Sequence, residues 1–193
     1  ILHNIYRRFV VMVICATIPT GIIGFAAQDL IALASKSLLA PGIGLIMTAI
    51  LLIISDAVET GNKIPKDISF TSSFLIGIAQ GLSTLPGLSR SGTTIAACLI
   101  SGYDKRFAVK YSFIMAIPAI LGAACLEISQ IGGSNVSISQ FFIYLVGAVV
   151  SGIVGYFCMK KMLTIVRKKK FRGFAIYCLI LGCISLIGYI AAR

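Results

Sequence analysis

Charged residues are scarce in this 193-residue chain, and acidic residues are the scarcest. Only 12% of the residues are charged, whereas a soluble domain carries about 25%. So little charge cannot cover a water-facing surface, which excludes an ordinary soluble fold. Five apolar stretches approach or exceed the roughly 18 residues that span a bilayer, at 9–27, 38–58, 107–128, 138–159 and 171–192. The sequence therefore predicts an all-α integral membrane protein.

Histidine occurs only once, as His3. A single histidine cannot complete a metal set, and it excludes the lipid phosphatases that use a histidine nucleophile from helical motifs. The six cysteines all lie inside apolar stretches without a C-x-x-C pair, so they are expected to behave as small hydrophobic residues. A serine hydrolase is also excluded, because residues 87–92 do not read G-x-S-x-G and no strand precedes them.

The net charge of +11 comes from basic residues in the short segments between apolar stretches, which favours a membrane over nucleic acid as the partner. The stretch 70–102 has two apolar halves around a Pro-Gly break, each too short for a hydrocarbon core of about 30 Å. If this stretch enters and returns, fourteen basic residues share one side and two lie on the other, with Arg90 uncounted. If it crosses once, the best split is eleven against five. The count favours a re-entrant hairpin, a cytoplasmic N-terminus and a C-terminus outside.

The predicted organisation is one membrane domain, 1–193, with five transmembrane helices and one re-entrant helix-loop-helix hairpin. Gly147, Ser151 and Gly155 recur every four residues, which predicts close packing of a neighbouring helix. Asp56 and Glu127, the carboxylates nearest to membrane depth, are expected to face headgroups or to pair with Lys or Arg. The chain opens without Met or a signal-peptide pattern, which suggests a fragment of a longer protein.

The break of the hairpin, residues 86–92, has the composition of an anion site. Irregular backbone at membrane depth is tolerated only where it lines a cavity or is buried in protein. Arg90 lies in this break, and no acidic residue occurs between Asp67 and Asp104 to neutralise it. An unpaired arginine inside a membrane is costly and by default functional. The alternative, that Arg90 extends to the headgroups from a tight turn, would not need the Ser, Gly and Thr residues around it.

The candidate anion-binding residues combine backbone access, hydroxyl donors and a planar guanidinium that suits phosphate. A short helix predicted to begin near Thr93 and Thr94 would add free N–H groups and a positive dipole end. Half-helix ends in transporters use the same physics, so the pattern leaves the anion open. The full set is Gly87, Ser89, Arg90, Ser91, Gly92, Thr93 and Thr94.

The stretch QGLSTLPGLSRSGTTI at 80–95 closely resembles the C-terminal signature P-G-x-S-R-S-G-x-T-I of the bacterial undecaprenyl-diphosphate phosphatase family, also known for bacitracin resistance. YSFIMAIPAILGA at 111–123 and the opening ILH look like further parts of that family. The resemblance runs over essentially the whole chain. It implies a bacterial plasma-membrane enzyme that converts undecaprenyl diphosphate to undecaprenyl phosphate and recycles the lipid carrier for peptidoglycan synthesis.

The same resemblance implies two re-entrant hairpins related as inverted repeats, with the active site between them on the extracytoplasmic side. Arg90 and Ser89 are then the candidate catalytic residues, helped by Thr94. The family's divalent cation, Mg²⁺ or Ca²⁺, is held by an acidic E-x-x-x-E hairpin that this chain lacks. Gln80 and Thr84 stand at the repeat-equivalent positions and cannot replace those glutamates.

This chain alone is therefore expected to supply no metal ligand and to bind the diphosphate better than it turns it over. The expected partners are a polyprenyl diphosphate lipid and the membrane, with no nucleic acid, while association into a homodimer is left open. The alternative function is a polyprenyl-phosphate flippase or anion transporter that uses the same phosphate cradle. Phosphate release by the full-length protein would distinguish the two.

Overall fold

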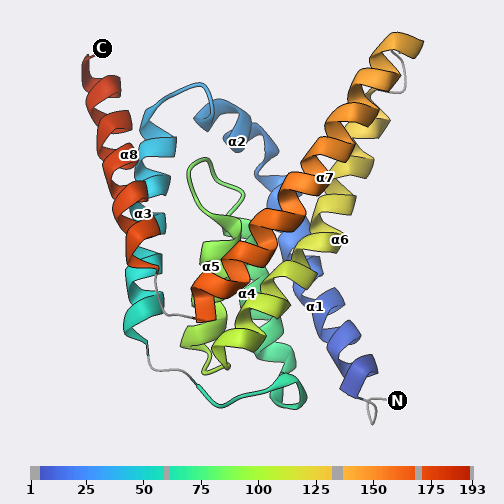
Figure 1. The fold of residues 1–193 in the computed structure, drawn as a ribbon, viewed down its shortest axis with the longest axis vertical. Coiled ribbons are helices and arrows are strands. Elements are labelled where there is room, and N and C mark those ends of the chain that lie inside the picture. The colour runs from blue at the N-terminus through green and yellow to red at the C-terminus, as the bar shows by residue number, and fades with distance from the viewer. Residues whose placement is uncertain (1–4, 59–60, 132–136, 168–170, 192–193) are drawn as a thin grey trace.

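The computed structural model describes residues 5–58, 61–131, 137–167 and 171–191, and within these residues the regular elements are all helices (Figure 1). Five of them are long and apolar enough to cross a membrane. The chain is therefore an all-α, multi-pass membrane protein, as predicted. The five are α1 (Ile5–Ala26), α3 (Leu39–Ala57), α6 (Lys105–Ile131), α7 (Ile138–Arg167) and α8 (Arg172–Ala191).

The long helices overlap the five predicted apolar stretches, and the largest difference is at the end of α7. This helix continues to Arg167, past the predicted end at 159. Lys160 and Lys161 end the apolar stretch without ending the helix, because lysine is a good helix former. A short helix, α2 (Gln28–Ala34), links α1 to α3, and a 3₁₀ turn (Pro65–Asp67) precedes α4.

Two short helices, α4 (Phe70–Leu82) and α5 (Arg90–Ile100), form a helix-turn-helix within the predicted hairpin 70–102. The segments that precede and follow this pair meet, because the Lys63 amide donates to the Gly102 carbonyl (3.2 Å) and the Asp104 amide donates to the Lys63 carbonyl (2.9 Å). The chain therefore leaves this pair at the end of the bundle where it arrived (Figure 1). That the pair enters a bilayer from this side stays a prediction.

Close packing occurs where glycine faces the backbone of another helix. A Cβ on Gly77 of α4 would lie 2.1 Å from the Ala16 carbonyl oxygen of α1, and a Cβ on Gly182 of α8 would lie 3.0 Å from the Gly42 carbonyl oxygen of α3. These contacts bring α1 against α4 and α3 against α8. Between α1 and α6, the aromatic rings of Phe9, Phe107 and Tyr111 pack together.

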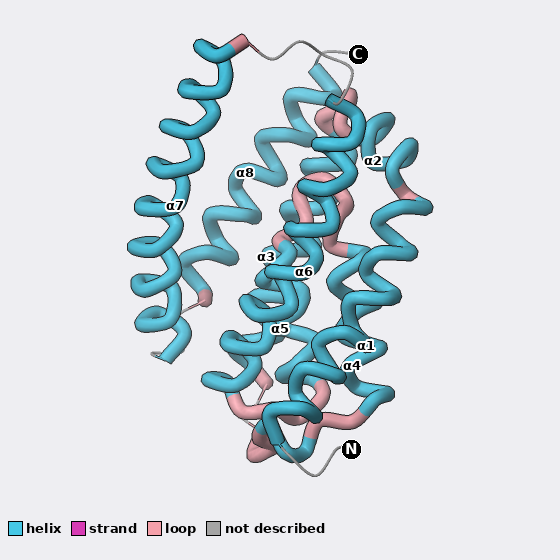
Figure 2. Tube along the Cα trace, turned by 90° about the vertical axis from the view of Figure 1, so that its right-hand side faces the viewer, coloured by secondary structure: helices cyan, strands magenta, loops and turns pink. Residues whose placement is uncertain are grey.

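The small-residue stripe on α7 does not pack as predicted. Apart from the neighbouring part of α7 itself, no atom of the described residues lies within 4 Å of a Cβ built on Gly147 or Gly155. Figure 2 shows why, since α7 lies at the edge of the bundle. A stripe of small residues brings helices together only where a helix faces it, and Gly155 borders a cavity instead.

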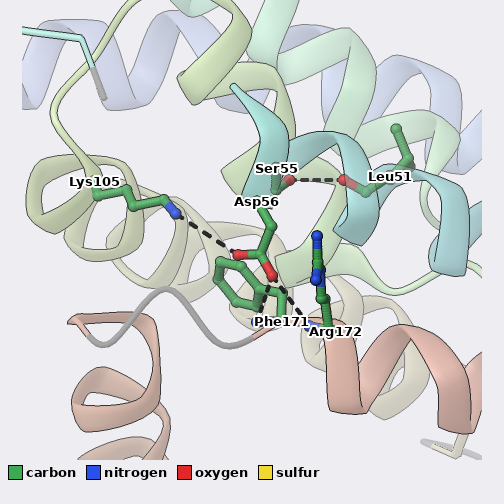
Figure 3. A network of polar contacts seen from close by, with 6 residues as sticks. All are labelled: Leu51, Ser55, Asp56, Lys105, Phe171 and Arg172. Carbon is green, nitrogen blue, oxygen red and sulfur yellow. Dashed lines mark hydrogen bonds and ion pairs between the residues drawn. The ribbon is translucent and has the colours of Figure 1, made fainter. Parts of the chain in front are cut away.

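Asp56, at the end of α3, contacts Lys105 of α6 and the start of α8, and so joins three helices (Figure 3). Its Oδ2 accepts from the backbone N–H groups of Phe171 (2.8 Å) and Arg172 (3.1 Å), so the carboxylate caps α8. Its Oδ1 lies 3.7 Å from Lys105 Nζ of α6, and the two side chains are only 11% and 7% exposed. The predicted pairing of Asp56 with a basic residue is confirmed, whereas Glu127 is exposed on α6.

Replacement of Asp56 by Ala should destabilise the bundle, because it removes a helix cap and one partner of a buried ion pair. We expect the free energy of unfolding to fall by about 2 kcal/mol or more. The measurement is the midpoint of thermal unfolding in detergent, which should be lower than that of wild type. Asp29→Ala is the matched control, since Asp29 is an exposed residue of α2. Equal midpoints for the two variants would contradict the capping role.

Candidate functional site

The turn between α4 and α5, residues 83–89, is held against α3 by one hydroxyl group. Thr48 Oγ1 donates to the Gly87 carbonyl (3.0 Å) and accepts from the Ser89 amide (2.9 Å). Gly44, one helical turn earlier in α3, lets the two segments approach, because a Cβ there would lie 2.2 Å from the Pro86 carbonyl oxygen. The backbone of the turn therefore has a hydrogen-bond partner inside the bundle, the Thr48 hydroxyl, as buried irregular backbone requires.

Gly87 meets two conditions that only glycine satisfies. Its φ is +85°, in the left-handed region that other residues rarely adopt. In addition, a Cβ on Gly87 would lie 2.2 Å from the Pro41 carbonyl oxygen at the start of α3. The role of Gly87 in the structure is to shape the turn and seat it on α3.

Helix α5 begins at Arg90, three residues before the predicted start at Thr93. Ser89 is the N-cap: its Oγ accepts from the Gly92 amide (3.2 Å), and its carbonyl accepts from the Thr93 amide (2.8 Å). The expectation was wrong because serine is a strong N-cap and can start a helix directly after the break. Arg90 and Ser91 thus lie in the first turn, where backbone N–H groups lack intrahelical partners and the dipole is positive.

Thr94 stabilises this first turn by hydrogen bonds on the buried side of α5. Its side chain is fully buried, and Oγ1 lies 2.9 Å from the Arg90 carbonyl oxygen and is hydrogen-bonded to Ser112 Oγ of α6. Thr93 Oγ1 is also buried, with no hydrogen-bond partner among the residues that the structure describes. Gly92 is buried where a Cβ would meet Ser89 Oγ at 3.1 Å. Gly92 and Thr94 are therefore packed inside the bundle at the helix start, whereas Thr93 is half-buried.

Arg90 and Ser91 line a cavity of about 970 Å³ between α5, α6, α7 and α8. The other five predicted site residues are not part of its wall. Ser112 adds a hydroxyl from α6, and apolar side chains make up most of the remaining surface. Within the described parts of the chain, the Arg90 guanidinium has neither a hydrogen-bond nor an ion-pair partner. The site is thus an unpaired cation at the wall of a largely apolar cavity.

Thr48 and Ser112 are functional candidates that the sequence analysis missed. Both are single hydroxyl residues inside apolar stretches, so they carry no local signal. Ser112 falls in the stretch 111–123 that resembles the phosphatase family, which was the one available indication. Their roles follow only from the approach of α3 and α6 to residues 87–94.

The site does not suit a metal ion. No group of three or more His, Cys, Asp or Glu side chains comes together in the described residues. Gln80 is buried and its Nε2 donates to the Met115 carbonyl (3.3 Å), while Thr84 Oγ1 donates to the Gly81 carbonyl (2.7 Å). The polar groups at the cavity include the Arg90 guanidinium, the Lys161 ammonium and hydroxyls, which suit an anion and not a divalent cation.

Comparison with known proteins gives one family. Residues 2–184 match the family described as bacitracin resistance protein BacA. The undecaprenyl-diphosphatase of Methanosphaera stadtmanae is 38% identical over 187 residues, which are 96% of this chain and 67% of that protein. Those of Halothermothrix orenii and Methanobrevibacter smithii are 34% and 39% identical over 94% and 96% of this chain, and 70% and 66% of their own lengths. The chain spans about two thirds of each relative.

Gly87→Ala should disrupt the turn, because the new methyl group meets the Pro41 carbonyl at a φ that alanine disfavours. We expect the free energy of unfolding to fall by at least about 1 kcal/mol. The measurement is the midpoint of thermal unfolding, which should fall with it. Gly24→Ala in α1 is the control, since nothing lies within 4 Å of its Cβ. A midpoint for Gly87→Ala at or above that of Gly24→Ala would refute the fit of the turn.

Thr48→Val keeps the shape of the side chain and removes the hydroxyl that holds the turn. The Gly87 carbonyl and the Ser89 amide then lose their partner, at a cost of about 1–3 kcal/mol. We expect a lower unfolding midpoint. Because the site suits an anion, we also expect added pyrophosphate, used as a probe, to raise this midpoint less than it does for wild type. Thr17→Val removes only a bond to Val13 within α1, and it should retain the pyrophosphate response. Equal responses in both variants would contradict the role of Thr48.

Proposed function

Because the chain belongs to the bacitracin resistance protein BacA family, we propose that it removes one phosphate from undecaprenyl diphosphate and leaves undecaprenyl phosphate. The single observation that carries this proposal is the unpaired Arg90 guanidinium at the wall of a largely apolar cavity. A substrate with an anionic headgroup and a hydrocarbon tail complements both features. The reaction would recycle the lipid carrier for peptidoglycan synthesis and contribute to bacitracin resistance.

The proposed chemistry is the addition of water across the phosphorus–oxygen–phosphorus linkage of the headgroup. One P–O bond breaks, one forms to the water oxygen, and inorganic phosphate leaves. Negative charge builds on the phosphate oxygens during this step, and preorganised donors stabilise it most in a site of low dielectric constant. Arg90 can form two parallel hydrogen bonds to one phosphate, and Ser91 and the first N–H groups of α5 add further donors.

The five remaining predicted residues act in this proposal mainly through the backbone that carries Arg90. Ser89 stays a predicted catalytic residue, although in this structure it caps α5 and does not line the cavity; its Oγ accepts from the Gly92 amide, which leaves its own hydrogen free to donate. Thr94 holds the Arg90 carbonyl against α6, so it is a positioning residue. Gly87, Gly92 and Thr93 complete the turn and the helix start.

The group that activates water is distinct from the residues that bind the headgroup. Mg²⁺ or Ca²⁺, which the family resemblance implies, would supply Lewis-acid chemistry. The described residues do not form a site for it. We propose that this chain contributes the cradle for the diphosphate, and that the acidic ligands of any cation belong to residues outside this sequence.

The proposed location is the plasma membrane, with the basic end of the bundle in the cytoplasm. Arg8 donates to the Ile68 carbonyl, Lys63 donates to the Ser101 carbonyl and Lys105 pairs with Asp56, so basic residues from three segments gather at one end. The positive-inside rule then puts the N-terminal end of α1 inside and the C-terminal end of α8 outside. Association into a homodimer stays a prediction. The transporter alternative is not favoured, because the relatives are named as diphosphatases.

Arg90→Ala should lower phosphate release from undecaprenyl diphosphate by about 100- to 1,000-fold in kcat, the loss typical of a removed transition-state donor. Arg90→Lys should recover only part of it, since lysine lacks the planar fork. The measurement is phosphate release by the full-length protein in detergent or proteoliposomes, with and without a chelator.

Arg106→Ala is the matched control, because Arg106 is an exposed residue at the basic end of α6 that does not line the cavity. It should retain nearly full activity. Wild-type protein that moves the lipid phosphate across a bilayer without hydrolysis would overturn the phosphatase proposal.

A further inference from the structure

Gln80 is a fully buried polar residue of α4 that the proposed chemistry does not use. Its Nε2 donates to the Met115 carbonyl of α6 (3.3 Å), whereas its Oε1 is buried with no hydrogen-bond partner among the described residues. A buried acceptor without a partner is unfavourable, and an apolar side chain of similar length would avoid that cost. The bond that Gln80 donates to α6 is therefore the feature that needs a functional explanation.

The carbonyl that Gln80 contacts lies in a turn of α6 that a proline interrupts. Pro118 is inside α6 and has no N–H group, so the Ile114 carbonyl four residues earlier loses its donor within the helix. Proline is tolerated in membrane helices where neighbouring segments supply hydrogen bonds to the backbone around it. Gln80 supplies such a bond to Met115, and we call residues 114–118 the proline turn.

The same part of α6 is also bonded to α5. Ser112 Oγ is hydrogen-bonded to Thr94 Oγ1, which lies 2.9 Å from the Arg90 carbonyl oxygen. Ser112 precedes Met115 by three residues, about one helical turn. Both helices of the hairpin therefore bond to adjacent positions of α6, α4 through Gln80 and α5 through Thr94.

This segment of α6 is also a wall of the cavity that Arg90 borders. Ser112, Ala116 and Ile117 line the cavity, whereas Gln80 does not, and Met115 is buried inside the bundle. The segment thus faces the cavity with some residues while its backbone is bonded to the hairpin. A shift of the proline turn would move Ser112 and the wall relative to Arg90.

We propose that Gln80 is a positioning residue for the anion site, because its amide holds the proline turn of α6 against the hairpin. The inference rests on the proposed function and extends it to a residue that does not touch the headgroup. With the proline turn fixed, Ser112 stays bonded to Thr94, and the first turn of α5 keeps Arg90 oriented. Preorganised donors lose their advantage when the backbone that carries them moves by about 1 Å.

Gln80→Met tests this role in the full-length protein, because methionine has a similar length and no N–H donor. Ser73→Ala is the matched control. Ser73 is also a fully buried residue of α4 bonded to α6, since it accepts from Tyr111 Oη (3.1 Å), but it lies about 10 Å from Gln80 along the helix. Both variants should lower the midpoint of thermal unfolding. Only Gln80→Met should also reduce the rise in midpoint that pyrophosphate gives, and lower kcat/KM for undecaprenyl diphosphate by about tenfold or more.

Pro118→Ala restores the N–H group that the proline turn lacks, and Pro118 itself does not line the cavity. We expect this variant to lower kcat/KM by about tenfold, because the restored helix changes the position of the wall. In the double variant, Gln80→Met should add little, so that the total loss stays near about tenfold instead of the roughly hundredfold expected for independent sites. A loss as large as for independent sites would overturn the link between Gln80 and the proline turn.

The outcomes separate this inference from the proposed function. No phosphate release by wild-type protein would overturn the proposed function, and the pyrophosphate response would still decide the role of Gln80. Equal pyrophosphate responses in Gln80→Met and Ser73→Ala would reduce Gln80 to a structural role and overturn the inference. A wild-type midpoint that pyrophosphate does not raise would overturn it too, since the anion site would then be absent. If Gln80→Met does not accumulate, Gln80→Asn, which keeps the amide but shortens its reach, should change both readouts in the same direction.

Discussion

A guanidinium held without a counter-charge inside an apolar helix bundle is the constraint on which the rest of this structure depends. Moving a charged arginine out of water is costly unless something compensates it, and Arg90 has no ion-pair partner among the described residues. The surrounding chain compensates only in part, through hydroxyl groups near it and through access to a cavity. The structure thus keeps a cation available to an anionic ligand.

The position of that cation depends on contacts from two other helices, α3 and α6. Thr48 of α3 holds both sides of the turn before Arg90, and Gly44 lets α3 come close enough to do so. On the other side, the hydrogen bond between Thr94 and Ser112 joins the first turn of α5 to α6. Backbone fixed on both sides is what a preorganised site needs, because donors that are already oriented pay no reorganisation cost during reaction.

Contacts at the basic end of the bundle also fix the helices that surround the site. Asp56 joins α3, α6 and α8 through one ion pair and two backbone hydrogen bonds, and these three helices are among those that surround the turn and the cavity. The backbone hydrogen bond between Lys63 and Gly102 joins the segment before α4 to the segment after α5. The hairpin is therefore held at its base as well as at its turn, even though α4 and α5 are short.

The sequence by itself determined the membrane class, the approximate extent of the long helices, and the break after α4. These features are local, since hydropathy over about 18 residues and the conformations of Pro and Gly do not depend on distant contacts. The signature around Arg90 also identified the family. Only the tertiary structure decided that Thr48 holds the turn, that Ser112 bonds Thr94 in the first turn of α5, and that Gly155 borders a cavity instead of a helix. Each of these depends on which helices approach one another, and packing between segments far apart in the chain leaves no periodic pattern in either segment alone.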